Sequence, residues 1–129
     1  MIRPLALVLG LTAGPAAAEA IAFAQGPELL LGVGIGPSYA EAMSDAVTDC
    51  GAPDFCVVTT ACSTGTWSLV LHVDHVDAVE WNEVYCGFAS REAVAAAAPA
   101  LCDSGARPDL KTCELAQVFD PEGRPTLGN

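Results

Sequence analysis

Two stretches of the chain repeat apolar residues at helical spacing, and each follows a serine that can cap a helix. After Ser38 the apolar positions are Tyr39, Met43, Ala46, Val47 and Cys50. Over 91–101 they are Val94, Ala97, Ala98 and Leu101. Ser38 and Glu41 form a capping box, and Gly51 stands where the first helix should end. Pro99 lies inside the second helix and predicts a kink or an early end.

Around these helices the pattern is typical of β-strands. Alternating and β-branched apolar runs predict strands over 29–35, 55–61, 67–73, 83–89 and 113–119. Gly32 and Gly34 share one face of the first run, which indicates a bulge or the close approach of another backbone. The order of elements favours the α+β class, as a small disulfide-bonded domain with two helices packed on an antiparallel-rich sheet.

The two halves of the chain share a spacing. Segments 38–50 and 90–102 each run from a capping serine to a cysteine twelve residues later. In each half a second cysteine, Cys56 or Cys113, then opens the next β-run. We interpret this as two similar strand–helix–strand repeats.

The residues of the repeat also form a recognisable motif. The first half reads Ser38-Tyr39-Ala40-Glu41-Ala42, then Cys50, Cys56-Val57-Val58 and Cys62; the second half reads Ser90-Arg91-Glu92-Ala93, then Cys102 and Cys113. This pattern resembles an uncharacterised bacterial family of small secreted domains, known as domain of unknown function 4189, over most of the chain after its leader. The resemblance implies no catalytic residues, so none is carried over.

The cysteines predict a disulfide framework. Six cysteines allow about 15 pairings. The repeat favours Cys50–Cys56 and Cys102–Cys113, each joining a helix end to the next strand, and Cys62–Cys86 then joins two strand regions. Such pairing requires an oxidising compartment and leaves no thiolate for catalysis or zinc binding.

The N-terminus has the pattern of a secretory signal peptide. Arg3 precedes a short apolar run over 5–11, and Ala16-Ala17-Ala18 is a small-residue cleavage site. The apolar run is shorter than the roughly 20 residues that span a bilayer. We therefore expect a signal peptide over 1–18 (with cleavage after 20 as the alternative), a single domain over 19–119 and a flexible tail over 120–129. The expected location is the periplasm or the medium.

The charge of the chain restricts its partners. There are 5 Lys and Arg against 16 Asp and Glu, which gives a net charge of −11 at pH 7. This surface repels phosphate backbones and anionic lipid, so we expect neither nucleic-acid binding nor membrane insertion of the mature chain. A basic partner would be attracted; the alternative is that the acidity serves solubility alone.

Few residues suggest chemistry. His72, Asp74 and His75 could bind zinc or copper, because imidazole and carboxylate are ligands of both metals. The spacing dictates no further ligand that would complete such a site, so a solvated strand end is favoured and no metal or cofactor is expected. Trp81 is the aromatic residue expected to mark an exposed binding surface.

These observations leave three functional hypotheses. The leading one is an exported, non-enzymatic module that binds a protein or an envelope component. The second is a small metal-dependent enzyme that uses His72, Asp74 and His75. The third is a purely structural envelope protein.

The leader generates the first prediction. The exported protein should begin at Glu19 or Ile21, because the alanine-rich site matches the preference of signal peptidase. Intact-mass analysis of the exported product measures this. An exported product that retains residues 1–18 would contradict it.

Overall fold

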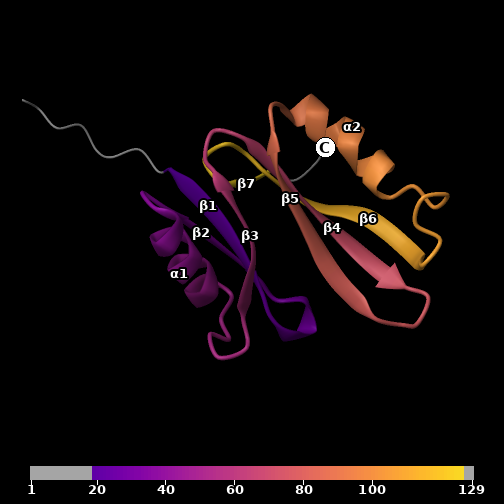
Figure 1. Cartoon of the computed structure of the whole chain (residues 1–129), viewed down its shortest axis with the longest axis horizontal. Coiled ribbons are helices and arrows are strands. Elements are labelled where there is room, and N and C mark those ends of the chain that lie inside the picture. The colour runs from indigo at the N-terminus through magenta and orange to yellow at the C-terminus, as the bar shows by residue number, and fades with distance from the viewer. Residues whose placement is uncertain (1–18, 127–129) are drawn as a thin grey trace, which may run out of the picture.

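The structure, a computed structural model, describes residues 19–126, so the expected leader over 1–18 and the last three residues of the chain lie outside it. Within the described range two helices and seven strands form four layers: helix α1, a first sheet, a second sheet and helix α2 (Figure 1). The first half contains β1 (Ala20–Gln25), β2 (Leu31–Gly36), α1 (Tyr39–Asp49) and β3 (Val57–Ser63), with a short 3-10 turn at Pro27–Leu29. The second contains β4 (Trp67–His75), β5 (Glu80–Phe88), α2 (Arg91–Leu101), β6 (Leu110–Phe119) and β7 (Pro125–Thr126).

The two halves have the same topology. The strand orders are β2-β1-β3 and β5-β4-β6-β7, and every pairing is antiparallel. In each half a hairpin leads into a helix, and the third strand returns beside the first strand of that hairpin. The α+β class is confirmed. The repeat includes one strand more than the sequence indicated, and the helices pack on two sheets rather than on one.

The helices begin where the sequence predicts. The hydroxyl groups of Ser38 and Ser90 accept hydrogen bonds from the backbone N–H groups of Glu41 and Ala93. These bonds satisfy amide donors that have no partner inside the helix. Helix α2 continues through Pro99 to Leu101, so the proline does not end it early.

Helix α1 lies very close to the first sheet. The alanines of β1 at positions 20, 22 and 24 are buried against Ala42 and Ala46 of the helix. On the neighbouring strand, a Cβ atom at Gly32 would overlap the carbonyl oxygen of Ala46, and one at Gly34 would overlap that of Ala42. The paired glycines therefore serve close backbone approach, one of the two alternatives that their spacing indicated.

Helix α2 covers the second sheet with larger side chains. Leu69, Leu71 and Val73 of β4 alternate toward the helix and pack with Val94 and Ala98. The alternation follows from the period of two in an extended strand.

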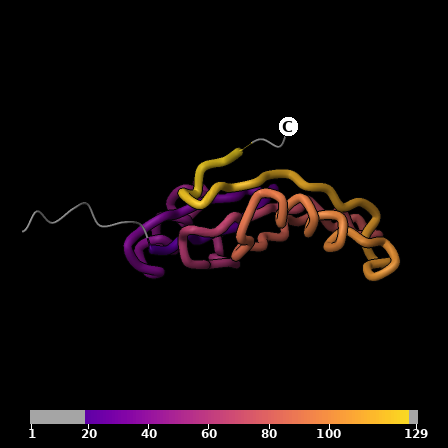
Figure 2. The backbone as a smooth tube through the Cα atoms, turned by 90° about the horizontal axis from the view of Figure 1, so that it is seen from above, coloured from indigo at the N-terminus to yellow at the C-terminus, as the bar shows by residue number. Residues whose placement is uncertain are grey.

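A third apolar cluster joins the two sheets. Ile21 and Phe23 of β1 pack against Val70 of β4 and Phe119 of β6, and the rings of Phe23 and Phe119 meet edge to face with centroids 5.3 Å apart. The turn before β7 lies over the same cluster, where Gly123, with a φ of +76°, contacts the side chain of Ile35. Figure 2 shows this C-terminal segment crossing above the first strands. Where the sequence suggested a flexible tail over 120–129, residues 120–126 form a turn and β7.

All six cysteines are paired. The disulfides are Cys50–Cys56, Cys62–Cys86 and Cys102–Cys113, the pairs that the repeat favours, with Cα atoms 6.4, 6.4 and 5.4 Å apart. The first and third join a helix end to the strand that follows, while Cys62–Cys86 connects the two sheets. Their presence fits an oxidising compartment.

The close packing of α1 generates a prediction. Gly34→Ala should lower the free energy of unfolding by about 1–3 kcal/mol, because the added methyl group forces the helix away from β2. Gly105→Ala is the matched control, since a Cβ atom there meets only the side chain of Asp103. Urea denaturation of both variants measures the effect. Equal stability of the two variants would contradict the packing described here.

Candidate functional site

The three residues proposed as a metal site do not converge. Strand alternation places His72 and Asp74 on the face of β4 that carries Val70, turned away from α2. The ring of His75 instead lies beside Trp81, with centroids 6.0 Å apart, on the side that carries α2. Among residues 19–126 no group of three or more His, Cys, Asp or Glu side chains is arranged to hold a metal ion.

Asp74 and His75 have charged side chains as neighbours. Asp74 lies 3.5 Å from the ammonium group of Lys111. His75 has Asp77 at 3.4 Å and Asp109 at 3.7 Å, and it accepts a hydrogen bond from the backbone of Asp77. These contacts hold the β4–β5 turn against the start of β6.

Trp81 is half-buried rather than freely exposed. Its indole packs against the cluster beneath α2, and its N–H donates to Glu83 Oε1 at 3.1 Å. Tyr85 donates to the other oxygen of the same carboxylate at 3.0 Å, and Arg107 donates to both oxygens, at 2.5 and 2.8 Å. Arg107 also donates to the carbonyl of Leu101, so this cluster fixes the C-terminal end of α2 on β5.

The charge of Glu83 is well compensated. The hydrogen bonds from Arg107 contribute most to holding the pKa of Glu83 below its ordinary value of 4.5, and Tyr85 and Trp81 add to this, while burial acts in the opposite direction. Burial, followed by the bond to Glu83, raises the pKa of Tyr85. A carboxylate with both oxygens occupied in this way supports structure rather than proton transfer.

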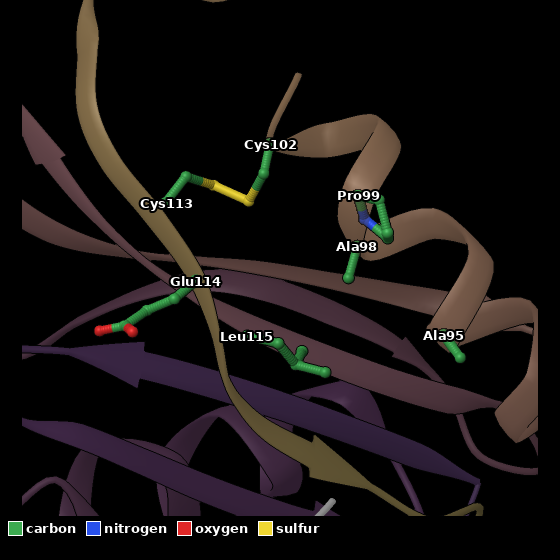
Figure 3. A pocket seen from close by; sticks show the side chains of 7 residues that line it. All are labelled: Ala95, Ala98, Pro99, Cys102, Cys113, Glu114 and Leu115. Carbon is green, nitrogen blue, oxygen red and sulfur yellow. A yellow bond between two sulfur atoms is a disulfide. The ribbon is translucent and has the colours of Figure 1, made fainter. Parts of the chain in front are cut away.

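A groove of about 380 Å³ lies between α2 and β6 (Figure 3). We call it the α2–β6 groove; its lining residues are Ala95, Ala98, Pro99, Cys102, Cys113, Glu114 and Leu115. The Cys102–Cys113 disulfide bridges the helix and the strand at one end. Leu115, which is 40 % exposed, projects on the side of α2, whereas the Glu114 side chain points away from the helix.

The groove exists because α2 lies farther from its sheet than α1 does. In the first half, β2 presents Gly32 and Gly34 to its helix. In the second half, the corresponding strand β5 presents the side chains of Trp81, Glu83 and Tyr85 to the cluster beneath α2. The bulky side chains of β5 hold α2 away from the sheet. The small residues Ala95 and Ala98 then do not fill the space between the helix and β6.

Beside the groove, β6 has an open edge. Strand β7 pairs only with Val118 and Phe119, and among the described residues no strand pairs with 110–117 on the side away from β4. The remaining edges are covered at least in part. The Asp49 carboxylate accepts the Val33 N–H at 2.8 Å, and β3 lies along β5, where Thr60 donates to the carbonyl of Val84 at 3.4 Å.

Proteins that remain monomeric usually protect strand edges, because unpaired N–H and C=O groups invite a further strand. Sequence reasoning missed this site, whose residues read as ordinary helix and strand positions. One signal was present: Pro99 in an alanine-rich helix marks a helical face with a backbone carbonyl that lacks its usual donor.

Comparison with protein-family models, with curated proteins and with solved structures finds no match for this chain. The resemblance to domain of unknown function 4189 therefore stays a prediction. Among residues 19–126, neither helix is long and apolar enough to cross a membrane.

The Glu83 cluster generates a prediction about pH. At pH 7, Glu83→Gln should be less stable than the native protein by about 1–3 kcal/mol, because it weakens bonds to a charged acceptor. The folded-state pKa of Glu83 is depressed, so its stabilising effect is present above pH 4.5 and is lost as the pH falls through the folded value. The difference in stability between the native protein and Glu83→Gln should therefore shrink below pH 4.5.

Thermal unfolding of both proteins between pH 3 and pH 7 measures this difference in stability. Glu80→Gln, at an exposed position on the same strand, is the control and should differ little from the native protein throughout. If the stability difference between Glu83→Gln and the native protein did not depend on pH, the prediction would be contradicted.

The separation of His72 from His75 generates a prediction about metals. Treatment with a chelator should leave the melting temperature unchanged, because the two imidazoles lie on opposite faces of the sheet. Differential scanning calorimetry with and without chelator tests this. A large fall that zinc restores would favour the metal hypothesis.

Proposed function

We propose that this protein is an exported, non-enzymatic module that binds another protein through the α2–β6 groove. The observation that carries the proposal is an open apolar groove lying directly beside a strand edge with which no strand of residues 19–126 pairs over 110–117. Apolar contact and backbone pairing are the two interactions by which sheet edges bind other chains. The three disulfides support a setting in the periplasm or the medium, where no cytosolic reductant maintains free thiols.

The groove is long enough to hold a short segment of another chain. The groove follows α2 from Ala95 to Cys102, about two helical turns, and β6 runs along its other side. Its lining is predominantly apolar, with Glu114 as the charged residue at its rim. The net charge of −11 favours a basic partner.

Site-specific photocrosslinking in the exporting cell tests the proposal. A photoreactive phenylalanine analogue replaces Leu115 in the groove, and a matched sample carries it at Phe55, which is 72 % exposed in the first half. We expect a protein adduct from position 115 and none of the same mass from position 55. The adduct should disappear in Ala95→Phe, which fills the groove, and persist in Ala96→Phe, one residue outside the lining.

Two results would contradict the proposal. One is the absence of any adduct at position 115 while the protein is folded and oxidised. The other is an adduct that Ala95→Phe leaves unchanged, since this would place the partner elsewhere.

A further inference from the structure

We propose that the partner binds as an extended segment that adds a strand to β6, with apolar residues alternating with lysine or arginine. This inference rests on the proposed function and specifies the chemistry of the partner. It depends on four features of the same surface: a backbone edge that is open among the described residues, an existing strand on that edge, two different faces and a helix carbonyl without its usual donor.

The edge already accepts an antiparallel strand. Strand β7 pairs with β6 through Thr126 opposite Val118 and Pro125 opposite Phe119. Within the described residues this pairing reaches Val118, and no described strand pairs with the backbone of β6 toward Leu110 on this side. A segment of another chain can pair with Thr112–Leu115, the regular stretch between the two register irregularities of β6, in the same orientation as β7.

The two faces of β6 differ in chemistry. Cys113 and Leu115 lie on the side of α2, where the groove is apolar. Glu114 lies on the opposite side, is exposed, and has no ion pair or hydrogen bond among residues 19–126. Side chains of an added strand alternate between the same two faces. One set therefore enters the groove, and the intervening set lies near the Glu114 carboxylate.

The groove wall offers one further acceptor. Pro99 has no N–H group, so the carbonyl of Ala95 lacks its usual donor within α2. Both Ala95 and Pro99 line the groove. A hydrogen-bond donor on the bound segment can therefore approach the carbonyl of Ala95.

Charge selects a foreign segment over a second copy of this chain. Each copy has a net charge of −11, so two copies repel each other. The nearest cation on β6, Lys111, already lies 3.5 Å from Asp74. The uncompensated charge at the edge is thus the negative charge of Glu114.

Fluorescence anisotropy with synthetic peptides tests the inference on the oxidised protein. The probe is a labelled seven-residue peptide that alternates lysine and valine. Its controls are a peptide of the same composition with the valines grouped together, and a peptide that alternates glutamate and valine. We expect saturable binding of the alternating lysine peptide and much weaker binding of both controls.

Protein variants locate the site. Ala95→Phe should abolish binding of the alternating peptide, whereas Ala96→Phe should bind normally. Glu114→Lys should weaken binding about fivefold or more. Asp45→Lys makes the same change in net charge on an exposed position of α1 and should have a much smaller effect. The melting temperature of each variant confirms that it is folded.

The outcomes separate this inference from the proposed function. Equal binding of the grouped peptide, or binding that Ala95→Phe and Glu114→Lys leave intact, would overturn strand addition in favour of general charge attraction. Absence of peptide binding together with an adduct at position 115 would overturn strand addition while leaving the binding function in place. Concentration-dependent dimers that Ala95→Phe disrupts would assign the edge to a second copy instead.

Discussion

The contact between Phe23 and Phe119 is the centre of the apolar cluster that, with the Cys62–Cys86 disulfide, joins two units with separate cores. Each ββαβ unit buries one face of its sheet under its own helix. The inner faces meet in a small cluster that these two rings share with Ile21 and Val70. To reach that cluster, β6 must extend as far as Phe119, which places its last residues under the β7 turn and, among the described residues, leaves 110–117 without a strand on that side. The open surface is thus a consequence of how the two units join.

The local features of the fold could be predicted from the sequence. Capping serines, helical spacing and the cysteine repeat are short-range signals, and the structure contains both helices at the expected positions. The pairing of two sheets is a long-range property. Alternation in β1 shows that alanines occupy one face and Ile21 with Phe23 the other, but it does not show what covers each face.

The candidate site was less predictable for a related reason. Trp81, Glu83 and Tyr85 share one face of a strand, and that spacing indicates mutual contact more than an exposed aromatic surface. The groove itself depends on a difference between the halves. The glycines of β2 allow α1 to pack close to its sheet, whereas the bulky residues of β5 keep α2 farther from its sheet. A duplicated topology with different side-chain volumes thereby gives one closed half and one half with a groove.

Amide hydrogen exchange of the free, oxidised protein tests the central claim, that the edge of β6 is open. An edge strand bonds its neighbour through alternate amides, so exchange along Thr112–Leu115 should alternate between slow and fast, while Leu69–Val73 of the central strand β4 should exchange slowly throughout. NMR with residue resolution measures both segments in one sample. Uniformly slow exchange along Thr112–Leu115 would mean that the edge is already covered, and would contradict this account.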